Sequence, residues 1–125
     1  RNVFWNLEHA DKAYEEAYRV LKKDGILILE DGNYYRRFFS DKYQKAYDEF
    51  QRGHEKEEQG CHARHNKENV DFSIMDEIAK KLPMSQVDRP AWDFNKLVET
   101  GFHKIQVEIA GSPLPMSFCI VAQKG

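Results

Sequence analysis

The feature that most constrains the fold is an unbroken apolar run at residues 26–29 (ILIL), which ends at residues 30–32 (EDG). A strand that is apolar on both faces is typical of a parallel sheet covered on both sides. Residues 8–22 repeat apolar side chains at three- and four-residue spacing, which predicts an amphipathic helix that Gly25 ends in the left-handed conformation. A helix that leads into such a strand is the second half of a βαβ unit. We therefore expect a further strand beside residues 26–31 and interpret the chain as a truncated piece of a larger fold.

The C-terminal part of the sequence predicts a short helix and two strands. Residues 90–102 have helical apolar spacing, with Asp93 as the expected N-cap and Gly101 at the C-terminal stop. Residues 103–109 alternate apolar and polar side chains, as in a strand with one solvated face, whereas residues 118–122 are continuously apolar. We expect an antiparallel hairpin that closes the sheet, with residues 117–123 in its interior.

The middle of the chain is mostly polar and predicts two helices. Ser40 precedes one at residues 41–58, and Ser73 is the expected cap of another at residues 74–82, which Pro83 ends. Residues 60–69 lack periodicity, so we expect an exposed, mobile loop there. Arg89-Pro90 and Trp92 are expected to be structural, because proline keeps the preceding residue out of helical geometry and tryptophan fills a helix–sheet contact.

Composition narrows the class of protein. The chain has 125 residues, 32% charged and 41% hydrophobic, as in one globular domain. Its formal net charge of -2 argues against a nucleic-acid partner, and no apolar run is long enough to cross a membrane. Two cysteines favour a reducing, cytoplasmic setting. We divide this single partial domain into residues 1–32 (helix and central strand), 33–88 (helical cap or insertion) and 89–125 (last helix and closing hairpin).

Three short segments carry a family resemblance. Residues 1–7 (RNVFWNL), 19–25 (RVLKKDG) and 26–31 (ILILED) resemble the class I S-adenosylmethionine-dependent methyltransferases of the type 11 kind. In that family an RVLKPGG turn joins the helix after the fourth strand to the fifth strand, so Lys23 and Asp24 stand where the family prefers Pro and Gly. Residues 82–85 (LPMS), 89–93 (RPAWD) and 101–102 (GF) resemble one branch of the same family.

The resemblance implies an α/β fold, the C-terminal part of a Rossmann-like methyltransferase sheet. The family's strand order is 3-2-1-4-5-7-6 with the seventh strand antiparallel, and residues 26–31, 103–109 and 117–123 correspond to strands five, six and seven. The glycine-rich turn after the family's first strand has no counterpart, because no two glycines of this sequence are spaced G-x-G. We therefore expect the chain alone to be inactive and not to bind S-adenosyl-L-methionine tightly.

Candidate site residues follow the ends of two strands, where ligands bind in open α/β sheets. The resemblance places Arg1 and Asn2 near the cofactor. Substrate contacts are expected from five residues after the fourth and fifth strands: Trp5, Asp31, Asn33, Tyr34 and Tyr35. Each has a plainer interpretation, since Trp5 could simply pack beneath the following helix and Asp31 could be a turn former rather than a base. The aromatic residues between positions 34 and 50 could cap a substrate or be buried against an absent half.

One further cluster combines histidine and cysteine: His54, Cys61, His62 and His65. Nitrogen and sulfur ligands of this kind can surround zinc. The spacing matches no established zinc pattern, and residues 55–58 (EKEE) form a solvated charge run. We therefore expect an exposed loop and no metal site.

The function that the resemblance implies is methyl transfer, in the full-length protein, from S-adenosylmethionine to a small-molecule acceptor. A non-catalytic interaction module with the same half fold is one alternative. A fragment of a nicotinamide-dependent oxidoreductase is another, although the closing hairpin and the turn at residues 19–25 argue against it. We expect no nucleic-acid or membrane partner. Because residues 26–31 would form an open apolar edge, we also predict a homodimer or domain-swapped assembly through that strand.

Overall fold

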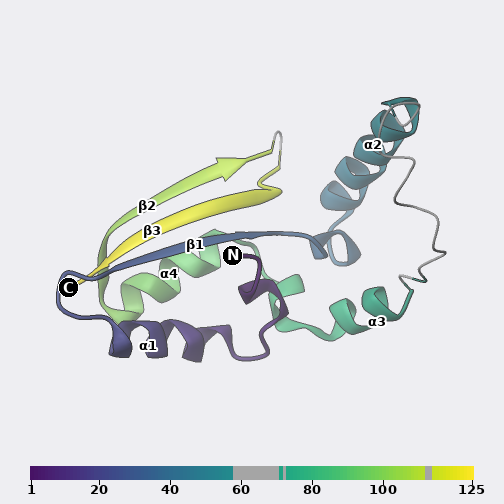
Figure 1. Cartoon of the computed structure of the whole chain (residues 1–125). Coiled ribbons are helices and arrows are strands. Elements are labelled where there is room, and N and C mark those ends of the chain that lie inside the picture. The colour runs from purple at the N-terminus through teal and green to yellow at the C-terminus, as the bar shows by residue number, and fades with distance from the viewer. Residues whose placement is uncertain (58–70, 72, 112–113) are drawn as a thin grey trace.

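The structure is a computed structural model that describes residues 1–57, 71, 73–111 and 114–125. These residues form a mixed α/β fold (Figure 1). The helices are α1 (Ala10–Val20), α2 (Asp41–Glu57), α3 (Ser73–Lys81) and α4 (Ala91–Thr100), and the strands are β1 (Ile26–Gly32), β2 (Phe102–Ala110) and β3 (Ser117–Lys124). Three short 3-10 turns are η1 (Phe4–Asn6), η2 (Arg36–Phe38) and η3 (Pro83–Ser85).

The three strands form one open antiparallel sheet in the order β1-β3-β2. Ile120 of β3 lies between Leu29 of β1 and Val107 of β2. The prediction that the last strand is interior and forms an antiparallel hairpin with its predecessor is confirmed. On the other edge of β1, the backbone N–H of Asn2 donates to the carbonyl oxygen of Glu30 at 2.8 Å.

One face of the sheet packs on α1 and α4, and the core lies between these two layers (Figure 1). Successive side chains of a strand point to opposite faces of the sheet, so every second side chain of β1 and β3 points towards the helices. The buried core consists of Tyr14, Leu29, Leu97, Phe102, Phe118, Ile120 and Ala122. The amphipathic helix predicted at residues 8–22 is present as α1, which buries Ala10 and Tyr14.

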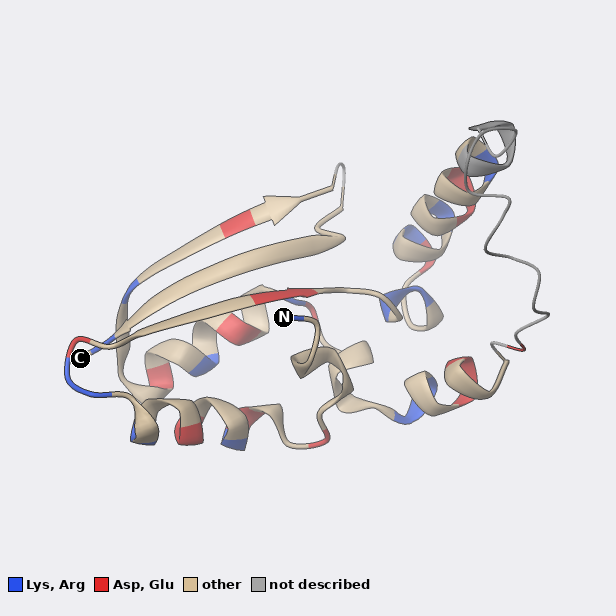
Figure 2. Cartoon of the chain, in the orientation of Figure 1, with Lys and Arg blue, Asp and Glu red and all other residues tan. Residues whose placement is uncertain are grey.

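The opposite face of the sheet is uncovered by the described part of the chain. Ile26 and Ile28 lie on it with 57% and 65% of their surface exposed, and few charges interrupt the strands in Figure 2. The prediction that the apolar run is buried on both faces is therefore wrong for the described residues. No strand parallel to β1 occurs among them either, since β1 is hydrogen-bonded to antiparallel β3. Residues 26–29 are apolar enough to be covered on both faces of the sheet, but the described residues cover only one of them.

The turn between α1 and β1 differs in detail from its prediction. Asp24, not Gly25, has the left-handed backbone, with φ of 63°. Gly25 is required for another reason, because a Cβ there would lie 2.8 Å from the carbonyl oxygen of Lys22. Gly101 ends α4 in the left-handed conformation as predicted, with φ of 112°.

Two predicted helix caps are wrong. Ser73 is the first residue of α3 and lies inside the helix, where its backbone N–H donates to the carboxylate of Asp71 at 2.9 Å. Asp93 lies inside α4, where its side chain is fully buried. The loop expected at residues 60–69 lies outside the described residues. No described helix combines the length and apolarity needed to span a membrane.

Candidate functional site

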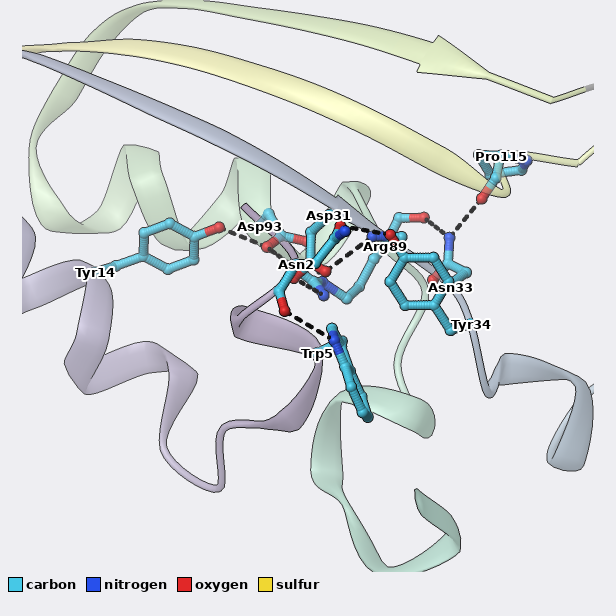
Figure 3. A network of polar contacts seen from close by, with 10 residues as sticks. Asn2, Trp5, Tyr14, Asp31, Asn33, Tyr34, Arg89, Asp93 and Pro115 are labelled. Carbon is cyan, nitrogen blue, oxygen red and sulfur yellow. Dashed lines mark hydrogen bonds and ion pairs between the residues drawn. The ribbon is translucent and has the colours of Figure 1, made fainter. Parts of the chain in front are cut away.

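A buried polar network joins the end of β1 to the start of α4 (Figure 3). Arg89 is 2% exposed, and its Nη1 donates to Asp31 Oδ2 at 2.9 Å. Its Nε and Nη2 bind the two oxygens of Asp93, both at 2.8 Å. Tyr14 of α1 completes the network by donating its hydroxyl proton to Asp93 Oδ1 at 2.5 Å. One guanidinium thus binds two carboxylates from different elements and fixes β1 against α4.

Burial governs the protonation of this network. Desolvation raises the pKa of Tyr14 far above its ordinary value, and the negative charge of Asp93 raises it further. Burial alone would lower the pKa of Arg89, but the hydrogen bonds and charges of Asp93 and Asp31 outweigh it and raise that pKa. Tyr14 therefore stays a hydrogen-bond donor and Arg89 stays a cation, so the two carboxylates keep their partners.

Asp31 and Asn33, both expected to contact substrate, are engaged within the protein. Asp31 is 2% exposed and its carboxylate accepts from Arg89 and from the backbone N–H of Gly32. Asn33 Nδ2 donates to the carbonyl oxygens of Arg89 and Pro115 at 2.8 and 2.7 Å. Asn33 Oδ1 has no hydrogen-bond partner among the described residues. These contacts favour a role in holding the end of β1 rather than in acid–base chemistry.

A first cavity, the edge cavity, opens beside the C-terminal end of β1. It measures about 360 Å³ and is lined by Arg1, Asn2, Glu30, Asp31, Tyr34, Glu108, Ile109, Ala110, Ser117, Phe118 and Cys119. Arg1, an expected cofactor contact, is exposed and forms an ion pair with Glu30 at 3.0 Å. Asn2, the other expected cofactor contact, has a left-handed backbone with φ of 54°, which asparagine tolerates better than most residues.

A second cavity, the aromatic cavity, lies between η1, the end of β1, α2 and α3. It measures about 580 Å³ and is lined by Asn2, Trp5, Tyr34, Tyr35, Arg37, Tyr47, Gln51 and Asp76. The structure thus brings together Asn2, Trp5, Tyr34 and Tyr35, four of the residues expected at the site. The two cavities share Asn2 and Tyr34 as lining residues.

The N-terminal segment holds the aromatic wall of this cavity. Trp5 Nε1 donates to the Asn2 carbonyl oxygen at 3.0 Å, and the Tyr34 hydroxyl donates to Asn2 Oδ1 at 2.6 Å (Figure 3). The Trp5 ring lies 5.2 Å from that of Tyr35 at an interplanar angle of 41°. Burial and the charge of Asp31 raise the pKa of Tyr34, so its hydroxyl remains a donor to Asn2 at neutral pH. Trp5 is therefore a wall of the cavity, one of the two interpretations that the sequence left open.

Arg37 is a lining residue that the sequence did not single out. Its guanidinium carbon lies 4.2 Å from the ring centre of Tyr47 and 4.3 Å from that of Phe38. Its Nη2 lies 3.5 Å from Asp76 Oδ1, which links η2 to α3. The only sequence signal was a pair of arginines inside the aromatic row at residues 34–50, and a charged pair there is also compatible with a solvated turn.

The histidine–cysteine cluster is not placed by the structure. Cys61, His62 and His65 lie outside the described residues, and for His54 only the backbone, within α2, is described. Within the described part of the chain, no three His, Cys, Asp or Glu side chains gather as a metal site would require. The other cysteine, Cys119, is a half-buried free thiol on β3.

The fold and the site define a mixed α/β protein whose described residues form an open three-stranded sheet, with the edge cavity and the aromatic cavity at the C-terminal end of β1. Comparisons of the chain with protein-family models, curated proteins and solved structures find no match.

Proposed function

We propose that the full-length protein is an S-adenosylmethionine-dependent methyltransferase for a small-molecule acceptor, and that this chain supplies the acceptor side of the site. The resemblance at residues 19–25 and 89–93 supports this proposal. So does the sheet order β1-β3-β2 with β3 antiparallel, because it is the order 5-7-6 that the resemblance implies. The left-handed Asp24 stands where the family prefers glycine, the residue best suited to that conformation.

The observation that carries the proposal is the aromatic cavity at the end of β1. A concave site with mostly aromatic walls and a few polar groups is typical of small-molecule binding. It gathers Asn2, Trp5, Tyr34 and Tyr35 from two segments that are far apart in the sequence. Open α/β folds bind ligands at the C-terminal ends of their strands, which is where this cavity lies.

The residues of this chain do not by themselves fit the cofactor. The lining of the edge cavity includes the carboxylates of Glu30, Asp31 and Glu108, and Arg1 is already paired with Glu30. No glycine-rich turn that could bring backbone N–H groups against the cofactor occurs in the sequence. We therefore assign cofactor binding to a separate segment of the full-length protein and derive no catalytic step through it.

Calorimetric titration with S-adenosylhomocysteine tests this division. We expect no heat of binding with residues 1–125 alone and saturable binding with the full-length protein, followed by methyl transfer when S-adenosylmethionine and acceptor are supplied. Tight binding by residues 1–125 would overturn the assignment of the cofactor to another segment. Absence of binding by the full-length protein would overturn the methyltransferase proposal.

The uncovered sheet face favours a second candidate, a non-catalytic interaction module. Ile26 and Ile28 expose apolar surface beside the edge of β1, and exposed apolar strands at a sheet edge pair readily with other chains. For this candidate we predict a dimer through residues 26–31 in sedimentation experiments. Ile28→Lys should then be monomeric, whereas Ile74→Lys on α3, a comparably exposed position, should dimerise like the parent. A parent chain that remains monomeric at high concentration contradicts this candidate.

A further inference from the structure

The guanidinium of Arg37 is held in the wall of the aromatic cavity without a close polar partner in the described part of the chain. Its side chain is 12% exposed. Nη1 donates to the Tyr34 carbonyl oxygen at 3.4 Å, and Nη2 lies 3.5 Å from Asp76 Oδ1. Guanidinium–carboxylate hydrogen bonds usually measure about 2.7–2.9 Å. The rings of Tyr47 and Phe38 instead hold the cation by cation–π contact.

The loose contact with Asp76 leaves room for an exchange of partners. The Asp76 side chain is 35% exposed at the start of α3, so water can solvate its carboxylate when it turns away from Arg37. A ligand carboxylate could then approach the guanidinium at the shorter distance and in bidentate geometry. A cationic ligand would instead meet the positive charge of Arg37. Once Asp76 has turned away, Arg37 is the charged group that remains in the described lining of the cavity, and it favours an anion over a cation.

The remaining walls favour a flat ring. Trp5, Tyr35 and Tyr47 present ring surfaces to the cavity, and aromatic pairs stabilise one another beyond the burial of their area. The Tyr47 hydroxyl accepts a hydrogen bond from Gln51 Nε2 at 2.8 Å, and its own proton has no acceptor among the described residues. It can thus donate to a ligand oxygen. The volume of about 580 Å³ lies within the usual range for small-molecule sites.

We propose that the aromatic cavity binds a planar aromatic carboxylate. The ring lies among Trp5, Tyr35 and Tyr47, and the carboxylate replaces Asp76 on Arg37. Naming this compound as the methyl acceptor rests on the function proposed above, but its binding does not require the cofactor.

Calorimetric titration of the cofactor-free protein with 4-hydroxybenzoate tests the ligand class. We expect saturable binding, and binding at least about ten-fold weaker for 4-hydroxybenzamide, which keeps the ring and lacks the charge. Cyclohexanecarboxylate, which keeps the charge and lacks the aromatic ring, should also bind more weakly. No binding of 4-hydroxybenzoate, equal binding of the amide, or preferred binding of phenyltrimethylammonium would each overturn the proposal.

Two variants test the exchange of partners. Arg37→Met should weaken 4-hydroxybenzoate binding by about ten-fold or more, because a charge-assisted hydrogen bond is lost. Asp76→Asn should tighten binding, since the competing carboxylate is gone. Arg19→Met, which removes the same charge from the exposed side of α1, should keep the parent affinity. Should Arg37→Met fail to fold, Asp76→Asn decides, and unchanged or weaker binding in that variant contradicts the exchange.

The outcomes separate this inference from the proposed function. If no aromatic carboxylate binds the cofactor-free protein, the proposed ligand class is overturned. S-adenosylhomocysteine binding by the full-length protein would still support the methyltransferase proposal. Conversely, 4-hydroxybenzoate binding without any cofactor binding supports the cavity and overturns only methyl transfer.

Discussion

Two arginines in this protein illustrate two different uses of the same side chain. Arg89, between the sheet and α4, binds Asp31 and Asp93 at 2.8–2.9 Å and is almost completely buried. Arg37, in η2, lies over the rings of Phe38 and Tyr47 and meets Asp76 only at 3.5 Å. The first has all its strong partners inside the protein, while the second has ring contacts and a nearby cavity.

The surroundings of the two arginines indicate which of them can bind a ligand. A buried cation whose carboxylate partners are close has no room for another anion, and removing either partner leaves a buried charge uncompensated. A cation that rings hold in place keeps its hydrogen-bond donors available to an incoming group. The region around Arg89 therefore maintains the fold, and the region around Arg37 is suited to binding.

The largest expected effect on the free energy of unfolding is that of replacing Arg89. Arg89→Met should lower the free energy of unfolding by about 3–5 kcal/mol, because Asp31 and Asp93 lose their common cation while they remain buried. Urea denaturation followed by circular dichroism measures this loss. Arg19→Met is the control for an exposed ion pair and should leave the free energy of unfolding nearly unchanged, because water already solvates both partners. A loss of less than 1 kcal/mol in Arg89→Met would break the comparison.

Tyr14→Phe has a smaller effect that depends on pH. At neutral pH we expect a loss of about 1–3 kcal/mol in the free energy of unfolding, because the buried Asp93 loses a hydrogen-bond donor. Burial and Asp93 raise the native pKa of Tyr14 above its ordinary value of 10.0. The native state therefore retains a proton that the unfolded chain releases above pH 10, so this contribution is complete below pH 10 and falls as the pH rises further.

Denaturation of parent and variant between pH 8 and pH 11.5 isolates that contribution. Above pH 10 the parent should lose up to about 1.4 kcal/mol per pH unit more than Tyr14→Phe, which has no phenol to titrate at this position. Parallel pH profiles for the two proteins would show that the Tyr14 phenol is not protected in the native state.

The smallest expected change in the free energy of unfolding is that of replacing the other arginine, Arg37. Arg37→Met should change the free energy of unfolding by about 1 kcal/mol or less, because methionine retains the packing between the rings and only cation–π and partly exposed ionic contacts are lost. The same denaturation experiment measures it. A loss comparable with that of Arg89→Met would mean that Arg37 also maintains the fold.

Local sequence patterns predicted most of the elements but fewer of their ends. Within the described residues, apolar spacing indicated α1, α2, α4 and β2, and apolar runs indicated β1 and β3. A capping pattern and Pro83 indicated α3. Caps and turn conformations were harder, because several neighbouring polar residues can each supply the same hydrogen bond. Ser73 lies inside α3 rather than before it, and Asp24 rather than Gly25 takes the left-handed turn.

For the candidate site, the sequence indicated which residues follow a strand end but not how each is used. It grouped Asp31 and Asn33 with Tyr34 and Tyr35, yet the first two are bound inside the protein and the last two line the aromatic cavity. Asp31 lies within β1 and Asn33 directly after it, whereas Tyr34 and Tyr35 lie in the turn that follows, so the two pairs meet different surroundings. Arg89 and Arg37 were not distinguishable by residue type, since the carboxylates of Asp31 and Asp76 that they meet come from segments distant in the chain.

The periodicities, the apolar strands and the polar residues that follow them could be read from the chain, because they depend on side chains a few positions apart. Three features become visible only in the folded protein: one face of the sheet is covered, Asp31 and Asp93 share Arg89, and Arg37 lies among aromatic rings beside a cavity. Those outcomes depend on which distant segments meet and on how much water they exclude, and both follow from packing rather than from local spacing.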